Sequence, residues 1–373
     1  MRDVIIVGGG LAGLINAVLL SRAGLSVLLI EKKNYPFHRV CGEYISNEVV
    51  PFLRANDLYP EGLAPSQISR FELSSVKGRV ARQPLGMGGF GISRYMIDEF
   101  LAGRARSAGV EVMEGTTVRD VRYVEEYFEV ETSDGDFESR LVIGAFGKRS
   151  KLDTHLKREF MHRRSPYLAV KYHVRTDYSK DSIALHNFRQ GYCGVSSVGG
   201  DTYNLCYLSH RDNLKGVDIP TMEERVLHQN PLLASLWRNA DFLLERPLVI
   251  NEISFEKKEA IWGHVLMCGD TAGMITPLCG NGMAMAIRSA WLLSGLILRH
   301  WNNGSIDRGT LELAYQKVWN EQFAYRLWAG GQFQRMFGSP LLSELGVALM
   351  RQGLIARKLI GLSHGEVFEQ KSQ

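Results

Sequence analysis

The chain has 373 residues, of which 45% are hydrophobic and 23% are charged, and its formal net charge is +4. This composition is typical of a soluble globular protein, and at roughly 150 residues per domain the length predicts two domains. The charge is too small and too evenly spread to indicate a nucleic-acid partner. The five cysteines are scattered, without a C-x-x-C pair or a histidine cluster, so we expect a reducing, cytoplasmic location and no metal site.

The first predicted element is a buried strand over residues 4–7, which runs into a glycine-rich turn and a helix. The turn reads Gly8-Gly9-Gly10-Leu11-Ala12-Gly13, and a second apolar run over residues 27–30 ends at Glu31 and Lys32. In a G-x-G-x-x-G turn, Gly8 permits the tight bend, Gly10 lets the backbone approach a pyrophosphate, and Gly13 allows the helix to pack closely on the strand. Glu31 can accept hydrogen bonds from a ribose, and the helix N-terminus favours the negative charge of the pyrophosphate. The segment therefore predicts a dinucleotide-binding βαβ unit.

The following elements divide the chain between two patterns. Helical spacing over residues 95–108 is followed by predicted strands over 110–113 and 118–145, whereas residues 165–260 alternate as in an antiparallel sheet. A doubly wound pattern resumes at residue 265 and helices follow. We therefore predict an α/β fold with a Rossmann-type dinucleotide-binding domain, an inserted substrate domain with a mixed or antiparallel sheet, and C-terminal helices. The expected bounds are 1–75, 92–160 and 262–330 for the first, 76–91 and 161–261 for the second, and 331–373 for the helices.

A second signature appears far downstream. The segment Cys268-Gly269-Asp270 ends a predicted strand, and Pro277 and the sequence Gly280-Asn281-Gly282 precede a long apolar helix. An aspartate in this position can bind the hydroxyl of a sugar alcohol. The N-terminus of the helix would direct N–H dipoles at developing negative charge, which a reduced flavin needs at its N1–C2=O edge. The helix, over residues 283–298, is too short and too charged at Arg288 to span a membrane.

With both signatures, the chain resembles the FAD-dependent oxidoreductases built like p-hydroxybenzoate hydroxylase, and among them the geranylgeranyl reductase-like branch. The resemblance covers nearly the whole chain and implies FAD as the cofactor and NAD(P)H as the electron donor. It implies that Arg39 lies near the cofactor, that Arg94 opens a helix in an R-x-x-[ILF]-D motif beside the flavin, and that Asp270 holds the ribityl chain. The full set of implied cofactor residues is Gly8, Gly10, Leu11, Ala12, Gly13, Glu31, Lys32, Arg39, Arg94, Gly269, Asp270, Pro277, Gly280, Asn281 and Gly282.

Two segments depart from the family pattern. Where the family has G-A-D-G, this chain has Gly144-Ala145-Phe146-Gly147, which removes a carboxylate tied to FAD and nicotinamide binding. Where the reductase branch has G-Y-x-W-x-F-P, residues 191–197 keep Gly-Tyr and lack Trp, Phe and Pro. The first change leaves the docking of NAD(P)H open, and the second predicts a reshaped or enlarged pocket.

The sequence leaves the reaction open. No W-x-W segment is present, so we do not expect a halogenase. The breadth of the family and the missing Trp, Phe and Pro favour a monooxygenase that hydroxylates a hydrophobic small molecule with reduced FAD and O₂. Cys41-Gly42-Glu43 and the C-terminal resemblance favour the alternative, a C=C reductase of an isoprenoid or polyene. Of these two reactions we expect the monooxygenase. A non-catalytic lipid- or prenyl-binding protein of the GDP-dissociation-inhibitor type is the alternative of another class, and the intact glycine motifs argue against it.

The candidate catalytic side chains are Cys41, Glu43 as a general acid whose pKa an apolar pocket would raise, and Tyr192 as a hydrogen-bonding partner of the substrate, with His173 and His186 as further possible bases. Each has a structural explanation beside the functional one: Cys41 as a small buried hydrophobe, Glu43 in an ion pair with an arginine, and the others in packing. Residues 333–362 combine apolar residues at helical spacing with interleaved arginines and a lysine. They predict a lid over a lipophilic substrate, a peripheral membrane contact, or helices packed on the core. The oligomeric state is not determined by the sequence.

Overall fold

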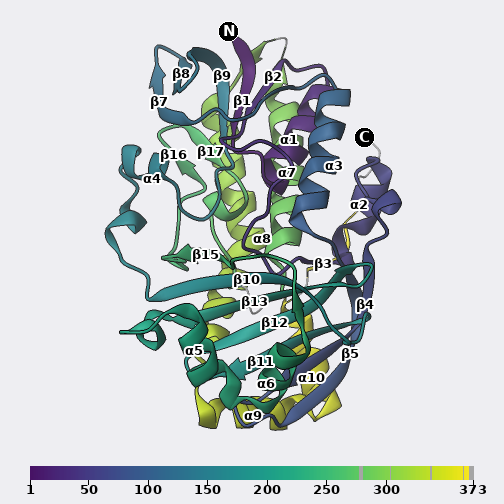
Figure 1. The fold of residues 1–373 in the computed structure, drawn as a ribbon. Coiled ribbons are helices and arrows are strands. Elements are labelled where there is room, and N and C mark those ends of the chain that lie inside the picture. Colours follow the sequence, from purple (N-terminus) through teal and green to yellow (C-terminus); the bar gives the residue numbers. More distant parts are fainter. Residues whose placement is uncertain (277–279, 303, 337, 364, 369–373) are drawn as a thin grey trace.

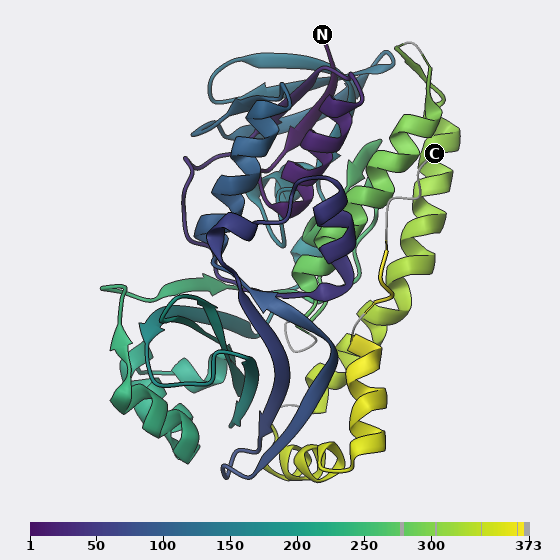
Figure 2. The ribbon, with the colours of Figure 1, turned by 90° about the vertical axis from the view of Figure 1, so that its right-hand side faces the viewer.

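The computed structural model describes residues 1–276, 280–302, 304–336, 338–363 and 365–368. Two large sheets divide the molecule into an upper and a lower half, and long helices run along one side of both (Figures 1 and 2). Among the described residues, no helix combines the length and the hydrophobicity that crossing a bilayer requires.

The upper half is built on a mixed sheet with a parallel centre. Its strand order is β16 (Ile261–Trp262), β17 (Val265–Met267), β9 (Asp136–Gly144), β1 (Arg2–Val7), β2 (Val27–Ile30) and β6 (Glu111–Met113), and β7 (Val118–Val124) and β8 (Tyr127–Thr132) extend it through β9. The strands from β17 to β6 pair in parallel. Because ligands bind beyond the carboxyl ends of such strands, this sheet places the turns after β1, β2, β9 and β17 at one edge.

Helices cover this sheet. α1 (Leu11–Arg22) is buried along nearly its whole length, because α3 (Arg94–Ser107) and α7 (Gly282–His300) pack on both of its sides (Figure 1). α8 (Arg308–Met336) packs on the outside of α7, and the short hairpin of β18 (Trp301–Asn302) and β19 (Ser305–Ile306) connects these two helices. The smaller α2 (Val50–Ala55) and α4 (Lys151–His155) lie in connecting segments.

The lower half is a nine-stranded sheet that is antiparallel except for one parallel pair, β4 with β11. Its order is β14 (Asp241–Phe242), β10 (Tyr167–Arg175), β13 (Thr202–His210), β12 (Gly191–Gly199), β11 (Ser182–Phe188), β4 (Ser66–Ser74), β5 (Val80–Gly91) and β3 (Tyr44–Ser46), with β15 (Leu248–Asn251) on β10. One face packs on α5 (Ile219–Val226) and α6 (Pro231–Asn239), and the other packs on α9 (Pro340–Met350) and α10 (Gly353–Ser363).

The inserted mixed sheet agrees with the predicted fold class, but one predicted boundary is wrong. The sequence predicts that residues 1–75 belong to the cofactor domain, whereas β3 and β4 both belong to the lower sheet. β4 pairs with β5 as a hairpin, from Ser66 opposite Gly91 to Ser74 opposite Val80. The alternation within a strand predicts which face is buried but not which sheet the strand joins.

Residues 365–368 follow α10 along the chain and lie against the upper half (Figure 2). The backbone N–H of Gly365 donates to the buried carboxylate of Glu48, and the ring of Phe368 packs against both Phe52 and Trp291, with centroid distances of 5.3 and 4.8 Å. The guanidinium of Arg288 lies over the same Phe368 ring at 4.5 Å. Residues 365–368 therefore form a strap between the two halves.

Candidate functional site

The glycine turn after β1 has the geometry that its sequence predicts. Gly8 adopts a φ of +104°, and a Cβ atom there would lie 2.5 Å from the carbonyl oxygen of Ala145. A Cβ at Gly13 would lie 2.0 Å from the carbonyl oxygen of Gly8, so α1 packs closely on β1 only with glycine at this position. At Gly10 the one neighbour is the Arg94 guanidinium at 3.6 Å. The space above Gly10 is thus open, as a backbone that receives a pyrophosphate requires.

Glu31 is buried at the end of β2 and accepts hydrogen bonds from the backbone N–H groups of Gly9 (2.9 Å) and Lys33 (3.2 Å). Arg39 binds the same carboxylate at 3.0 Å. These contacts fix Glu31 beside the glycine turn, where Lys32 also lines the cavity. These contacts hold the carboxylate where a ribose hydroxyl would bind.

Asp98 is a site residue whose role the sequence did not reveal. It is fully buried on α3 and binds both predicted arginines: Arg39 through Nε at 2.8 Å, and Arg94 through Nε and Nη2 at 2.8 Å each. The i,i+4 spacing of Arg94 and Asp98 on a helix is a signal for this pair. Burial alone would lower the pKa of Arg94, but Asp98 and the neighbouring Cys41 thiol raise it above its ordinary value. Two fixed positive charges thus face the cavity.

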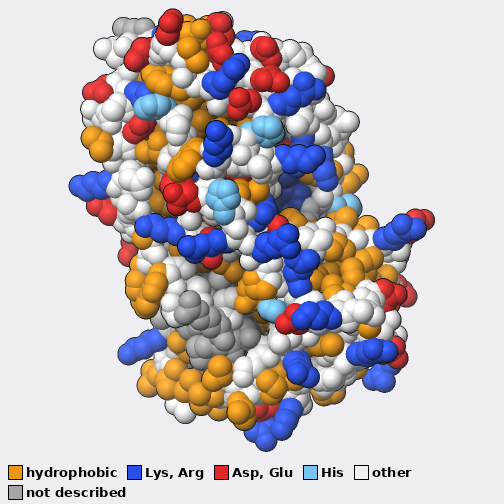
Figure 3. Space-filling view, turned by 90° about the vertical axis from the view of Figure 1, so that its left-hand side faces the viewer, with side chains coloured by type: hydrophobic (Ala, Val, Ile, Leu, Met, Phe, Trp, Pro, Cys, Tyr) orange, Lys and Arg blue, Asp and Glu red, His pale blue; other side chains and the backbone are white. Residues whose placement is uncertain are grey.

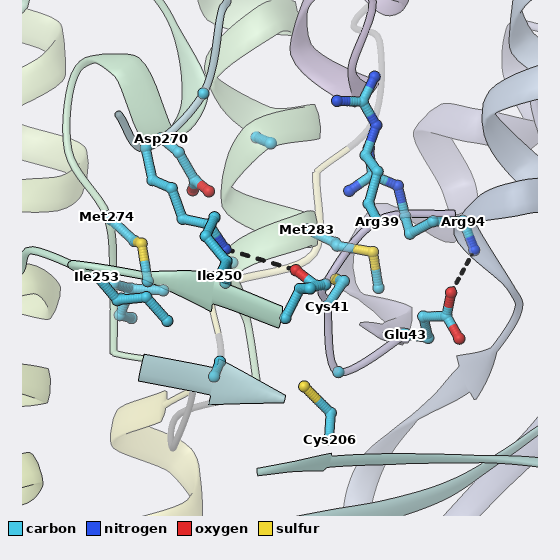
Figure 4. Close-up of a pocket in the computed structure, with 18 of the residues that line it drawn as sticks. Arg39, Cys41, Glu43, Arg94, Cys206, Ile250, Ile253, Asp270, Met274 and Met283 are labelled. Atoms are coloured by element: carbon cyan, nitrogen blue, oxygen red, sulfur yellow. Dashed lines mark hydrogen bonds between the residues drawn. The ribbon is translucent and has the colours of Figure 1, made fainter. Parts of the chain in front are cut away.

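The second signature lies directly against the first. Gly269 has a φ of +62°, and a Cβ there would lie 3.0 Å from the Cβ of Ala12. This contact brings Asp270 to the cavity, where its carboxylate points inward (Figure 4), and its backbone carbonyl accepts a hydrogen bond from Lys258 at 2.9 Å. Gly280, Asn281 and Gly282 line the cavity as well, although the amide of Asn281 donates to Glu48 at 3.2 Å. Pro277 lies outside the described residues.

These residues line one continuous cavity of about 820 Å³. Its upper part is polar and extends from Glu31 and the turn after β1 to Asp270 at the start of α7. Its lower part is largely aliphatic and is bounded by the inner faces of the lower sheet, α9 and α10, with side chains including Leu73, Leu85, Ile183, Leu185, Leu349, Met350, Leu359 and Ile360. The division into a polar and an apolar part fits a dinucleotide above and a lipophilic group below.

Glu43 has a structural role. Its side chain is fully buried, forms an ion pair with the buried Nζ of Lys171, and accepts hydrogen bonds from Nε2 of His173 (2.6 Å) and the backbone N–H of Arg94 (2.7 Å). Burial alone would raise the pKa of Glu43, but Lys171 and His173 hold the pKa below its ordinary value. An ionised carboxylate has no proton to donate, so the prediction that Glu43 acts as a general acid is wrong. Glu43 instead forms the ion pair that was the structural explanation, although its partner is Lys171 and not an arginine.

The remaining candidates separate into cavity and core positions. Cys41 and Tyr192 both line the cavity, and Cys41 lies close to Cys206 (Figure 4). His173 is hydrogen-bonded through Nε2 to the carboxylate of Glu43. His186 is buried between Ser74 Oγ (2.9 Å) and Tyr178 Oη (3.2 Å), and burial lowers its pKa to about 4. It is thus a neutral core residue and does not line the cavity.

Phe146, the residue in the place of the family aspartate, follows β9 and lies beside the glycine turn in the cavity wall. The backbone N–H of the next residue, Gly147, donates to Oγ1 of Thr271 at 2.8 Å. The same hydroxyl donates to the carbonyl oxygen of Gly147 at 3.2 Å. The loop is thus joined to the second signature through its backbone. Phe146 itself offers an apolar ring where the family aspartate has its carboxylate.

Comparisons with known proteins agree with this geometry. A family model described as "FAD binding domain" matches residues 1–315. The chain is 23% identical over 354 residues to conditioned medium factor receptor 1 of Dictyostelium discoideum, which covers 87% of this chain and 68% of that protein. It is 24% identical over 379 residues to digeranylgeranylglycerophospholipid reductase 2 of Methanopyrus kandleri, which covers 95% of this chain and 91% of the relative.

Solved structures with the same fold include both reductase-like and halogenating proteins. A geranylgeranyl bacteriochlorophyll reductase-like protein of Thermoplasma acidophilum superposes with a TM-score of 0.77 at 19% identity, over 98% of this chain and 96% of that one. The halogenase PltM superposes with a TM-score of 0.77 at 17% identity, over 96% and 84%. At these identities the likeness shows the fold. The family match spans most of the chain and agrees with a cradle shaped for a dinucleotide; the chain belongs to the FAD-binding domain family and is an FAD-dependent oxidoreductase.

Proposed function

We propose that this oxidoreductase reduces C=C bonds in an isoprenoid chain. The observation that carries the proposal is the aliphatic lower part of the cavity, which continues directly from the cofactor cradle. Its wall offers a long apolar substrate extensive contact and few hydrogen-bonding partners, with Asn187, Tyr192, Ser196 and Ser343 among the exceptions. The digeranylgeranylglycerophospholipid reductases among the relatives support the same substrate class.

Reduced FAD supplies the hydride in such a reduction, and the protein must position the chain, exclude water and deliver a proton to the neighbouring carbon. Gly8, Gly10, Gly13, Glu31 and Asp270 would hold the cofactor. In the described part of the cavity, the thiol of Cys41 is the candidate proton donor, because it faces the cavity next to the Arg94 guanidinium. NAD(P)H is the proposed electron source.

A flavin monooxygenase acting on a hydrophobic small molecule is the second candidate. It is favoured by strand β12, where Gly194 and Ser196 line the cavity in place of bulky side chains. A Cβ at Gly194 would have its nearest neighbour at 3.5 Å, the carbonyl oxygen of Cys206, so this part of the wall has room for a wider substrate. A wider and more polar section suits a ring that receives a hydroxyl group.

The product of a single defined substrate separates the two candidates. FAD-loaded protein is reduced with dithionite without oxygen and given a geranylgeranyl glycerophospholipid, and the product is analysed by mass spectrometry. Gain of two hydrogens for each reduced bond supports the reductase. In a second reaction the same lipid is incubated with the protein and NADPH in air, and gain of one oxygen atom supports the monooxygenase and overturns the first proposal. Recovery of unchanged lipid from both reactions also overturns the first proposal.

Two variants of Cys41 test its role. Cys41→Ala removes the thiol proton and is expected to lower kcat strongly. FAD binding should stay the same, because the alanine side chain lacks only the sulfur atom. Cys41→Ser keeps a donor in the same place and should retain more activity than the alanine variant. Equal activity of all three proteins would exclude Cys41 as the proton donor.

A further inference from the structure

The outer faces of α9 and α10 carry large apolar side chains that the protein itself does not cover. Leu341 is 84% exposed, Leu345 is 51% exposed and Leu354 is 78% exposed. Leu341 and Leu345 are four residues apart on α9 and therefore lie on one side of that helix. Ala348, one turn further along, is exposed as well. Exposed leucines concentrated on two adjacent helices indicate a contact surface rather than scattered surface residues.

The inner faces of the same helices line the apolar part of the cavity. Gly346, Leu349 and Met350 of α9 and Leu359 and Ile360 of α10 line it. A single layer of helix thus separates the cavity from the exposed leucines. The two helices lie at the end of the molecule opposite the cofactor sheet (Figures 1 and 2).

Basic side chains surround the leucines. Arg357 and Lys358 are exposed and follow Leu354 by one helical turn, so they lie on the same side of α10, and Arg351 is exposed between the two helices. Glu344 lies 3.4 Å from Arg79 of the neighbouring hairpin, which offsets its charge. In the space-filling view, hydrophobic side chains gather along the lower end of the molecule (Figure 3).

We propose that the α9–α10 surface, formed by Leu341, Leu345, Ala348, Arg351, Leu354, Arg357 and Lys358, docks the protein on an anionic lipid bilayer. Leucines enter the boundary between headgroups and acyl chains, while the arginines and the lysine bind anionic headgroups. This combination of an apolar centre and a basic rim matches a charged membrane surface more closely than a neutral one. This inference rests on the proposed function. A protein docked through this surface would place the helices that line the apolar part of the cavity against the bilayer that contains a lipid substrate.

The test is co-sedimentation of the FAD-loaded protein with vesicles that contain no isoprenoid lipid. Vesicles of phosphatidylcholine alone are compared with vesicles that mix phosphatidylcholine and phosphatidylserine. We expect binding to the mixed vesicles that weakens at high salt. Leu341→Gln with Leu354→Gln should weaken it by roughly tenfold or more, since each leucine withdraws a large apolar area from water. Arg357→Gln with Lys358→Gln should weaken it by roughly fivefold for each charge removed.

Leu313 provides the matched control. It is 75% exposed near the start of α8, far along the helix from α9, so Leu313→Gln removes an equally exposed leucine outside the surface. The expected result is unchanged vesicle binding for this variant. Flavin absorbance and the melting temperature verify that every variant is folded.

Two outcomes would overturn the proposal. One is a wild-type protein that does not bind the mixed vesicles, or binds them as well as the Leu341/Leu354 variant does. The other is a dimer in solution that the same two substitutions dissociate while vesicle binding is absent, which would make the surface an interface between two copies. Because the vesicles contain no substrate, neither result depends on the reaction that the enzyme catalyses.

Discussion

Glu43 and Lys171 form an ion pair in which both side chains are fully buried, although the residues are 128 positions apart in the chain. Glu43 belongs to the loop that follows Cys41, and Lys171 belongs to β10 of the lower sheet. The pair therefore joins the cofactor side of the cavity to the substrate side. Its carboxylate also accepts from the backbone of Arg94, so the ion pair supports the position of α3.

Breaking this pair should be costly, and replacing both partners should be much less so. Glu43→Gln leaves the ammonium of Lys171 buried without a counter-charge and is expected to lower the free energy of unfolding by about 3 kcal/mol. The double variant Glu43→Gln/Lys171→Met should recover most of that loss. Urea unfolding of the FAD-loaded proteins measures both values. A single variant as stable as wild type would contradict the buried pair.

The same variant predicts a pH dependence. Lys171 and His173 hold the pKa of Glu43 below its ordinary value of 4.5, so the unfolded chain binds the proton more readily than the folded protein. The stabilisation is present above pH 4.5 and is lost as the pH falls further. The stability difference between wild type and Glu43→Gln should therefore shrink below pH 4.5. A difference that grows in acid would reverse the sign of this argument.

His186 contributes a second pH dependence in a different range. Burial lowers its pKa from 6.5 to about 4, so between these values the unfolded chain binds a proton that the folded protein does not. Wild type should lose up to about 3 kcal/mol of stability from this group as the pH falls through that window. His186→Gln should remove this part of the loss, whereas the exposed His162→Gln should leave it unchanged. Denaturant unfolding at a series of pH values provides the comparison.

Asp98 should prove essential to the cofactor cradle. Asp98→Asn removes the charge that binds Arg39 and Arg94, and we expect a loss of about 3 kcal/mol in the free energy of unfolding together with weaker FAD binding. The substitution keeps the size of the side chain, so the effect reports the charge. FAD titration followed by flavin fluorescence measures the second quantity. An unchanged affinity would show that the two arginines keep their positions without Asp98.

Alanine substitutions at two glycines of the turn should affect different properties, the stability of the apoprotein at Gly13 and the affinity for FAD at Gly10. Gly13→Ala places a methyl group 2.0 Å from the carbonyl oxygen of Gly8, so the apoprotein itself should be destabilised. Gly10→Ala finds open space in the protein and should leave the apoprotein as stable as wild type while weakening FAD binding by roughly tenfold. Melting curves without FAD and titrations with FAD separate the two. Tight FAD binding by Gly10→Ala would place the pyrophosphate elsewhere.

Asp270→Ala should also weaken FAD binding, by roughly tenfold to a hundredfold, because one hydrogen bond to a charged group is lost. Asp270→Asn keeps a hydrogen-bonding side chain of the same size and should bind with intermediate affinity. The fold should be preserved in both, since Lys258 contacts the backbone carbonyl of Asp270 and not its carboxylate. Equal flavin content in all three purified proteins would remove Asp270 from the cofactor site.

The cofactor cradle was predictable because its signals are local. Gly8, Gly10 and Gly13 have roles that follow from one turn, and Glu31 follows at the end of the next strand. Asp98 was present in the motif with Arg94, but its bond to Arg39 depends on how α3 packs. The partnership of Glu43 with Lys171 depends on the arrangement of two sheets, and no pattern in either segment specifies it. For the same reason the mixed polar and apolar pattern of residues 66–74 predicted neither a strand nor the sheet that contains it.

The strap formed by residues 365–368 has a consequence for how the cavity opens. Because Gly365 and Phe368 fix residues 365–368 to the upper half, while α8 packs on α7 before α9 begins, the pair α9–α10 is held at both of its ends. A wall supported in this way is not a flap with one hinge. Opening the cavity on this side therefore requires one of the two attachments to loosen.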